Sequence, residues 1–242
     1  MGWDEALFGW LYRGARSLVR SRPTAESLAR AAHLDDVSPR LAIVASALAG
    51  EAVKIRGADG LGGQSPGVLS LPRTITLGGS RDDGERAYLA RVVLAVATVR
   101  LGLYAPRALD REEALAWTVM AAPTVRREAR AMLPGVDGLL DEVAGWELAA
   151  RPDVATLAPR EVALEACVRA ALEGRGEVRE VGEIAVAATA LRHELSGLST
   201  RRGSAVAGVV SWAPVGVRAE AREGAASAQR AMPAAATSGQ PT

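Results

Sequence analysis

The stretch DGERAYLARVVLAVATVRL, at residues 83–101, decides the fold class of this chain. Its large apolar residues recur at i, i+3, i+4, i+7 and i+10, the spacing of one face of an α-helix. These residues are Leu89, Val92, Val93, Val96 and Val99. Valine alone would suit a strand, but the length and the period favour a buried helix. Arg86, Arg91 and Arg100 lie off the apolar stripe.

Helical periodicity continues on both sides of this stretch, and proline and glycine residues mark where the expected helices begin and end. Ser38-Pro39 predicts a helix start, with proline at the first helical position, and Gly50 predicts the end of that helix. Pro123 is interpreted as another start, and residues 133–135 as a turn. The helices expected cover residues 4–20, 24–32, 38–50, 83–101, 110–120, 123–132, 136–149, 164–172 and 181–195.

Two short segments have the pattern of strands instead. They are AVKI at residues 52–55 and VLSL at residues 68–71, with a loop rich in glycine between them. We interpret them as a small two-stranded antiparallel hairpin near residues 52–72. It should lie against helices, because an isolated hairpin is marginally stable.

The composition agrees with a mainly α fold, a multi-helix bundle. Hydrophobic residues make up 49% of the 242 residues but aromatic residues only 4%, so alanine, leucine and valine must form most of the core. Alanine and leucine are strong helix formers. The predicted organisation is a helical domain at residues 1–200 and a linker-like, disordered tail at residues 201–242, which is rich in alanine, serine, glycine and proline.

The charge balance argues against partners held by long-range electrostatics. The chain has 29 basic and 28 acidic residues, so it has no strong field to attract nucleic acid or an anionic membrane. The apolar run at residues 92–99 is too short to cross a bilayer, and the N-terminus lacks a signal-peptide pattern. The sequence predicts a cytoplasmic protein with no nucleic-acid partner and no membrane insertion.

Residues that carry enzyme or metal chemistry are few and scattered. Cys167 lies on an apolar helix face and is expected to be a small core residue. His193 lacks the second histidine that a zinc-binding helix requires, and His33 is expected at a helix end, capping or exposed. The loop from Gly57 to Gly63 lacks the phosphate-binding motifs, which leaves a flexible loop or a binding surface.

The acidic pairs and the tryptophans are also expected to have structural roles. The pairs are Asp35-Asp36, Asp82-Asp83, Glu112-Glu113 and Asp141-Glu142. The second pair is expected to cap the long helix, and the last two to occupy first turns or solvated faces. The tryptophans are expected to be core or half-buried anchors, except Trp212, which is expected to pack the tail back on the domain or to dock on a partner. The prediction is a protein that is not an enzyme, with no catalytic residue, metal site or cofactor.

The order of several segments resembles a known family. They are the tryptophan-containing start at residues 3–18, residues 40–50, LSLPRTI at residues 69–75, DGERAYL at residues 83–89, and residues 124–135 and 151–171. In this order they resemble the N-terminal helical region of the nitric oxide reductase activation protein NorD and its relatives. Those proteins carry a von Willebrand factor A (VWA) domain and are partners of MoxR-type AAA+ ATPases. The resemblance covers about residues 1–215.

The chain departs from that family in one decisive way. The family's VWA domain has a metal-binding motif that begins Asp-x-Ser-x-Ser, and this sequence contains no such motif. The resemblance therefore implies a non-catalytic helical scaffold or adaptor that assists a MoxR-type ATPase in metalloenzyme activation. Its expected partner is that ATPase or a separate VWA protein. The chain is expected to be a truncated gene, a split protein or a free-standing module.

Two other functions remain open from the sequence. One is a helical small-molecule-binding or regulatory domain, with its pocket between the hairpin and the long helix. The other is a DNA-binding regulator in which residues 24–50 form a helix-turn-helix, although the neutral charge does not favour it.

Overall fold

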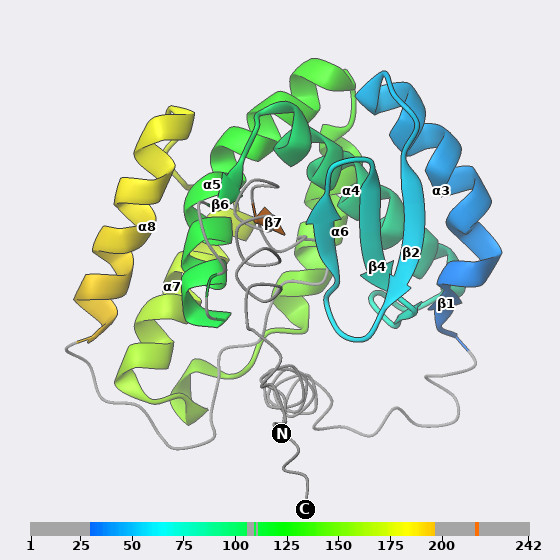
Figure 1. The fold of residues 1–242 in the computed structure, drawn as a ribbon. Helices are drawn as coiled ribbons and strands as arrows, with labels where there is room; N and C mark the ends of the chain where they lie inside the picture. Colours follow the sequence, from blue (N-terminus) through cyan, green and yellow to red (C-terminus); the bar gives the residue numbers. More distant parts are fainter. Residues whose placement is uncertain (1–29, 106–108, 110, 197–215, 218–242) are drawn as a thin grey trace, which may run out of the picture.

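The structure is a computed structural model that describes residues 30–105, 109, 111–196 and 216–217 (Figure 1). Within these residues the fold is mainly helical with small sheets, which confirms the predicted fold class. The helices are α3 (Leu34–Ala49), α4 (Arg81–Arg100), α5 (Arg111–Met132), α6 (Asp137–Ala149), α7 (Pro159–Leu172) and α8 (Val181–Ser196). The helix predicted at residues 4–20, residues 24–29 of the next one, and Trp212 lie outside the described residues. So does the tail predicted at residues 201–242, apart from residues 216–217.

Helix α4 lies at the centre of the molecule. It contacts α3, α5, α6 and strands of the small sheets, and Figure 1 shows it between α3 and α5. Every residue from 90 to 98 is therefore buried. The predicted apolar stripe is only part of this buried surface, because Arg91, which lies off that stripe, is 0% exposed.

The sheet beside α4 differs from the predicted hairpin. It consists of β2 (Lys54–Ala58), β3 (Gly63–Ser65) and β4 (Val68–Pro72), in the order β2-β4-β3. Strands β3 and β4 are antiparallel, and the two residues between them include Gly67, whose positive φ of 67° suits a tight turn. The two strands that the sequence predicted, β2 and β4, pair in parallel. The antiparallel prediction was wrong because the GQS segment of β3 has no strand pattern and yet occupies the other edge of β4.

The first described helix, α3, begins earlier than predicted. It starts at Leu34, directly after strand β1 (Ala32–His33), which pairs with β5 (Thr74–Ile75). Pro39 lies inside the helix, so it does not mark the start. Gly50 ends the helix with φ of 74°, as predicted. Of the helix-turn-helix considered at residues 24–50, residues 24–29 lie outside the described residues, and residues 34–37, where the turn was expected, belong to α3.

Helix α5 is continuous through Pro123, where the sequence predicted a break. Proline removes one helical hydrogen bond, but the surrounding packing stabilises the helix. The neighbouring Thr124 is 1% exposed. Its Oγ1 donates to the carbonyl of Arg179 at 2.8 Å and accepts from the amide of Arg179 at 3.0 Å. The segment that leads into α8 is thereby fixed against the middle of α5.

The remaining helices agree with the sequence. Helices α6 and α8 form where their apolar stripes predicted them, and the turn at residues 133–135 is present. Helix α7 ends as predicted but begins at Pro159, five residues before the predicted start at Leu164, and a 3-10 turn, η1 (Val154–Thr156), lies in the connection before it. Trp117 is buried and Trp146 half-buried against the core, as predicted. A last pair of short strands, β6 (Tyr104–Ala105) and β7 (Gly216–Val217), is parallel. In the part of the chain described here, no helix is long and apolar enough to span a membrane.

Candidate functional site

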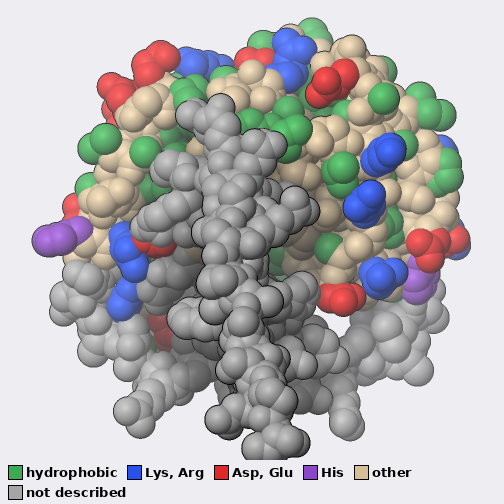
Figure 2. All heavy atoms as spheres, viewed as in Figure 1, with side chains coloured by type: hydrophobic (Ala, Val, Ile, Leu, Met, Phe, Trp, Pro, Cys, Tyr) green, Lys and Arg blue, Asp and Glu red, His purple; other side chains and the backbone are tan. Residues whose placement is uncertain are grey.

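The histidines and the cysteine are not brought together. His33 is the exposed N-cap residue of α3 and makes no side-chain cap bond, and His193 is exposed near the end of α8. Figure 2 shows the histidine side chains at opposite edges of the molecule. Cys167 is half-buried on α7, and burial, followed by the charge of Glu194, raises the pKa of its thiol. A raised pKa leaves less thiolate, the form that reacts. Among residues 30–105, 109, 111–196 and 216–217, no group of three or more potential metal ligands is found.

Asp83 caps the long helix, as the sequence predicted for this pair. Its Oδ2 accepts hydrogen bonds from the amides of Gly79 at 2.8 Å and Ser80 at 2.9 Å. Ser80 Oγ accepts from the Asp83 amide in return, which completes a capping box. The bond from Gly79 is the largest cause of the lowered pKa of Asp83, and the bond with Ser80 follows. This carboxylate is therefore engaged in holding the helix start.

Other acidic residues of the predicted pairs join helices. Asp36 of α3 pairs with Arg81 of α4, Glu142 of α6 with Arg86 of α4, and Asp141 of α6 with Arg126 of α5. Glu113 is 7% exposed in the first turn of α5 and pairs with Arg192 of α8. Its burial was not expected, and it arises because α8 covers the start of α5.

The glycine-rich loop has a structural explanation at one position. Gly62 has φ of 72°, and a Cβ there would lie 2.0 Å from the carbonyl oxygen of Ser70 on β4. Only glycine allows this conformation and this close approach of two backbones. The conformation favours the loop interpretation at this position.

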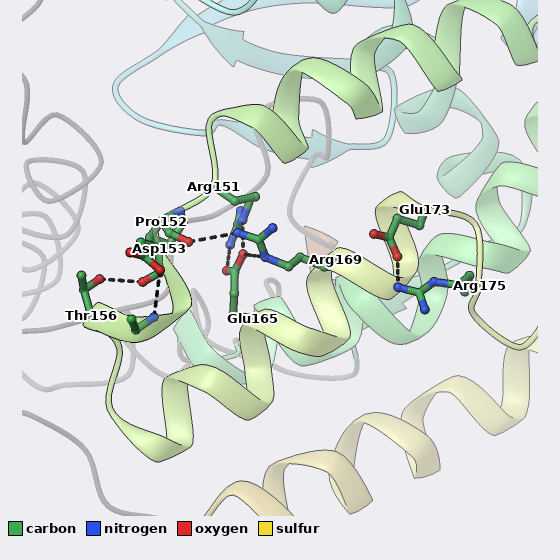
Figure 3. A network of polar contacts seen from close by, with 9 residues as sticks. Arg151, Pro152, Asp153, Thr156, Glu165, Arg169, Glu173 and Arg175 are labelled. Carbon is green, nitrogen blue, oxygen red and sulfur yellow. Dashed lines mark hydrogen bonds and ion pairs between the residues drawn. The ribbon is translucent and has the colours of Figure 1, made fainter.

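A buried ionic network connects the segment that follows α6 to α7 (Figure 3). Glu165 of α7 is 0% exposed, and both its oxygens accept from Arg151, one of them from Nε at 2.8 Å. Arg169 donates from Nε to the same carboxylate at 2.9 Å and from Nη2 to the carbonyl of Pro152 at 3.0 Å. Figure 3 shows both guanidinium groups directed at this one carboxylate. Because its oxygens are engaged by two cations, Glu165 acts as a structural clamp.

Arg91 forms a second buried charge, which the sequence did not reveal. It lies near Tyr88 and Glu147, and Tyr88 Oη donates to the carbonyl of Pro72 at 2.7 Å. Desolvation lowers the pKa of Arg91 to about 10, and the charge of Glu147 opposes the shift. Arg91 therefore stays charged at neutral pH. The only sequence signal for its burial is that apolar residues flank it on both sides.

A cavity of about 50 Å³ lies between α4, α5, α6 and α7. Its walls are mostly alanine, leucine and valine, and they include Thr98, Thr118 and Arg126. The sequence placed a pocket between the hairpin and the long helix. The cavity instead lies among the helices, because small residues on neighbouring helices leave space between them.

The outer face of α8 is uncharged in the middle of the helix, between the exposed residues Glu183 and Arg192. Ile184, Ala188 and Leu191 pack inward and are buried. On the opposite side Gly182, Val186, Thr189 and Ala190 are exposed, and Val186 is 70% exposed. Between Glu183 and Arg192 the sequence IAVAATAL contains no charge. We call these four exposed residues the α8 face.

Comparison of the chain with family models, with curated proteins and with solved structures gives no match. The resemblance to the N-terminal region of NorD-like proteins therefore stays a prediction. What bears on function is the chemistry of the α8 face, the cavity and the buried ionic networks.

Proposed function

We propose that this chain is a non-catalytic helical scaffold or adaptor that acts through protein contacts. The observation that carries the proposal is the α8 face. The outer side of a surface helix normally bears charged residues, and an exposed apolar surface is typical of a protein contact. Val178 and Val181, which are 43% and 37% exposed, extend the apolar character at the start of the helix.

The buried ionisable groups support a scaffold as well. Glu165 is held between two arginines, and Glu113 pairs with Arg192 across two helices. Asp83, which is not buried, is engaged in the cap of its own helix, α4. The two glutamates fix one element to another and Asp83 fixes a helix start, which suits a rigid body that presents a surface.

The chemistry of the α8 face indicates the kind of partner surface. A charged group buried against Val186 and Ala190 would lose its water without gaining an ion pair. The partner surface should therefore be apolar and uncharged. By resemblance we propose a MoxR-type AAA+ ATPase, or a separate VWA protein, as the partner, with metalloenzyme activation as the outcome. This identity rests on the resemblance alone.

Co-purification tests the identity of the partner. The tagged full chain is mixed with the purified MoxR-type ATPase of the host without nucleotide, with ADP and with a non-hydrolysable ATP analogue. The proposal expects retention of the ATPase in at least one state. Absence of retention in all three states would contradict the ATPase as partner, and the same assay with a VWA protein tests the other candidate.

A second candidate function is the binding of a small molecule. The cavity between α4, α5, α6 and α7 favours it, since ligand sites in helical proteins are commonly apolar cavities with a few polar groups.

A further inference from the structure

We propose that the cavity between α4, α5, α6 and α7 binds a short-chain aliphatic carboxylate, which Arg126 holds by its guanidinium group. This inference is independent of the proposed scaffold function, because the cavity is lined by α4, α5, α6 and α7 and the α8 face is not part of it. The apolar walls of the cavity include Ala90 and Leu94 of α4, Ala122 and Val125 of α5, and Leu140 of α6.

Arg126 supplies an unused donor. Its side chain is 12% exposed, and its Nη2 donates to Asp141 at the surface. Its Nε is buried and has no hydrogen-bond partner in the part of the chain that the structure describes. A buried donor without an acceptor is unfavourable. A ligand oxygen that accepts from Nε would remove this cost.

The charge balance around Arg126 favours an anion over a neutral acceptor. Asp141 is 69% exposed, so water screens most of its attraction to the buried guanidinium. The apolar walls strengthen an ion pair formed inside the cavity. Thr98 and Thr118 already donate to the carbonyls of Leu94 and Ala114, so Arg126 is left as the donor for a ligand.

The volume limits the size of the apolar part. An apolar cavity of about 150 Å³ holds benzene, which has six carbon atoms. A cavity of about 50 Å³ therefore has space for an apolar chain of roughly two to three carbon atoms. Ala90 and Ala122, on neighbouring helices, leave this space because their side chains are short.

A ligand series tests the proposal with the full chain. Butyrate, whose tail has three carbon atoms, is compared with acetate, which lacks a comparable tail, and with butyramide, which lacks the charge. Binding is measured by titration calorimetry and by the rise in thermal midpoint, since a ligand of the folded state stabilises it. We expect butyrate to bind at least about tenfold more tightly than butyramide, which lacks the charge-assisted contact, and at least about tenfold more tightly than acetate, which lacks two methylene groups that would be buried.

Variants locate the site. Arg126→Gln removes the cation and should weaken butyrate at least about tenfold. Arg130→Gln is the matched control, because Arg130 lies one turn further on α5 and pairs with Asp137 in the same way but is about half exposed. It should change butyrate affinity less than about twofold. Ala122→Leu fills the cavity and should abolish binding while the helical circular dichroism is kept, which tests the site even if Arg126→Gln unfolds.

Three outcomes would overturn the proposal. Equal binding of acetate and butyrate would mean non-specific anion binding. Equal binding of butyramide and butyrate would remove the carboxylate assignment. Unchanged butyrate affinity in both Arg126→Gln and Ala122→Leu would place any binding elsewhere.

Discussion

Buried charge is the main feature at the scale of single residues. Arg91 and Glu165 are both 0% exposed, in a core that otherwise consists mostly of alanine, valine and leucine. The sequence did not predict either position. Helical period identifies apolar stripes, whereas the burial of Arg91 depends on the helices that pack around α4, and the charge of Glu147 that acts on it lies on another helix. By contrast, Asp83 was predictable, because a cap depends on residues within four positions.

Glu165→Gln should strongly destabilise the fold. The change leaves Arg151 and Arg169 beside a neutral amide, and breaking a buried ion pair costs about 3–5 kcal/mol. Urea unfolding measures the loss. Glu142→Gln is the control, since Glu142 is 41% exposed where it pairs with Arg86, and the expected loss is below about 1 kcal/mol. Equal losses in the two variants would show that the network is not a clamp.

The cap at Asp83 predicts a pH dependence of stability. The pKa of Asp83 is lowered in the folded state from 3.8, so its ionised form favours folding. Its contribution is fully present above the unfolded pKa and is lost as pH falls through the folded one. Asp83→Ala should therefore lower the urea midpoint at pH 7 and lower it progressively less as the pH falls below 3.8, the unfolded value. Asp82→Ala, at the exposed neighbour, should lower the midpoint much less across this range. A midpoint difference for Asp83→Ala that persists unchanged at low pH would contradict this account.

At the scale of elements, local sequence patterns predicted most helices but not all of their starting residues or the pairing of the strands. Helices α4, α6, α7 and α8 follow apolar stripes that are complete within each segment. Proline at positions 39 and 123 suggested helix starts, because a proline inside a helix removes a backbone hydrogen bond and destabilises the helix. In the folded chain, packing against other helices outweighs this loss, and both prolines lie inside helices. The parallel pairing of β2 with β4 depends on β3, a segment with no strand pattern.

Glycine substitutions test the packing against α5. A Cβ on Gly176 would lie 2.3 Å from Cγ of Pro123, so Gly176→Ala should destabilise the fold by about 1–3 kcal/mol. Gly145→Ala is the control on α6, where no atom lies within 4 Å of the added Cβ. It should stabilise by about 0.5–1 kcal/mol, because alanine favours helix. Thermal or urea unfolding measures both. The same sign of change in the two variants would contradict the contact between Gly176 and Pro123.

At the scale of the whole molecule, the two outer helices each combine exposed charged residues with an exposed uncharged stretch. Helix α3 covers one side of α4, and its exposed residues Asp36 and Arg40 form ion pairs with α4. Helix α8 covers the outside of α5, and its exposed middle carries no charge. Figure 1 shows α3 and α8 at opposite ends of the helical layer, and Figure 2 shows charges of both signs scattered over the face drawn. Residues 41–49 of α3 also carry no charge and include the exposed Ile43, so this helix provides the matched control for a partner contact at α8.

One binding measurement tests the central claim most directly. Val186 and Ile43 are 70% and 71% exposed, so glutamate should be tolerated equally at both positions, but only Val186 belongs to the α8 face. The affinity of the full chain for the MoxR-type ATPase is measured for the wild type, Val186→Glu and Ile43→Glu. The account predicts at least about tenfold weaker binding for Val186→Glu, since burying an unpaired charge costs more than about 1.4 kcal/mol, and unchanged binding for Ile43→Glu. Equal affinities for Val186→Glu and the wild type would contradict it.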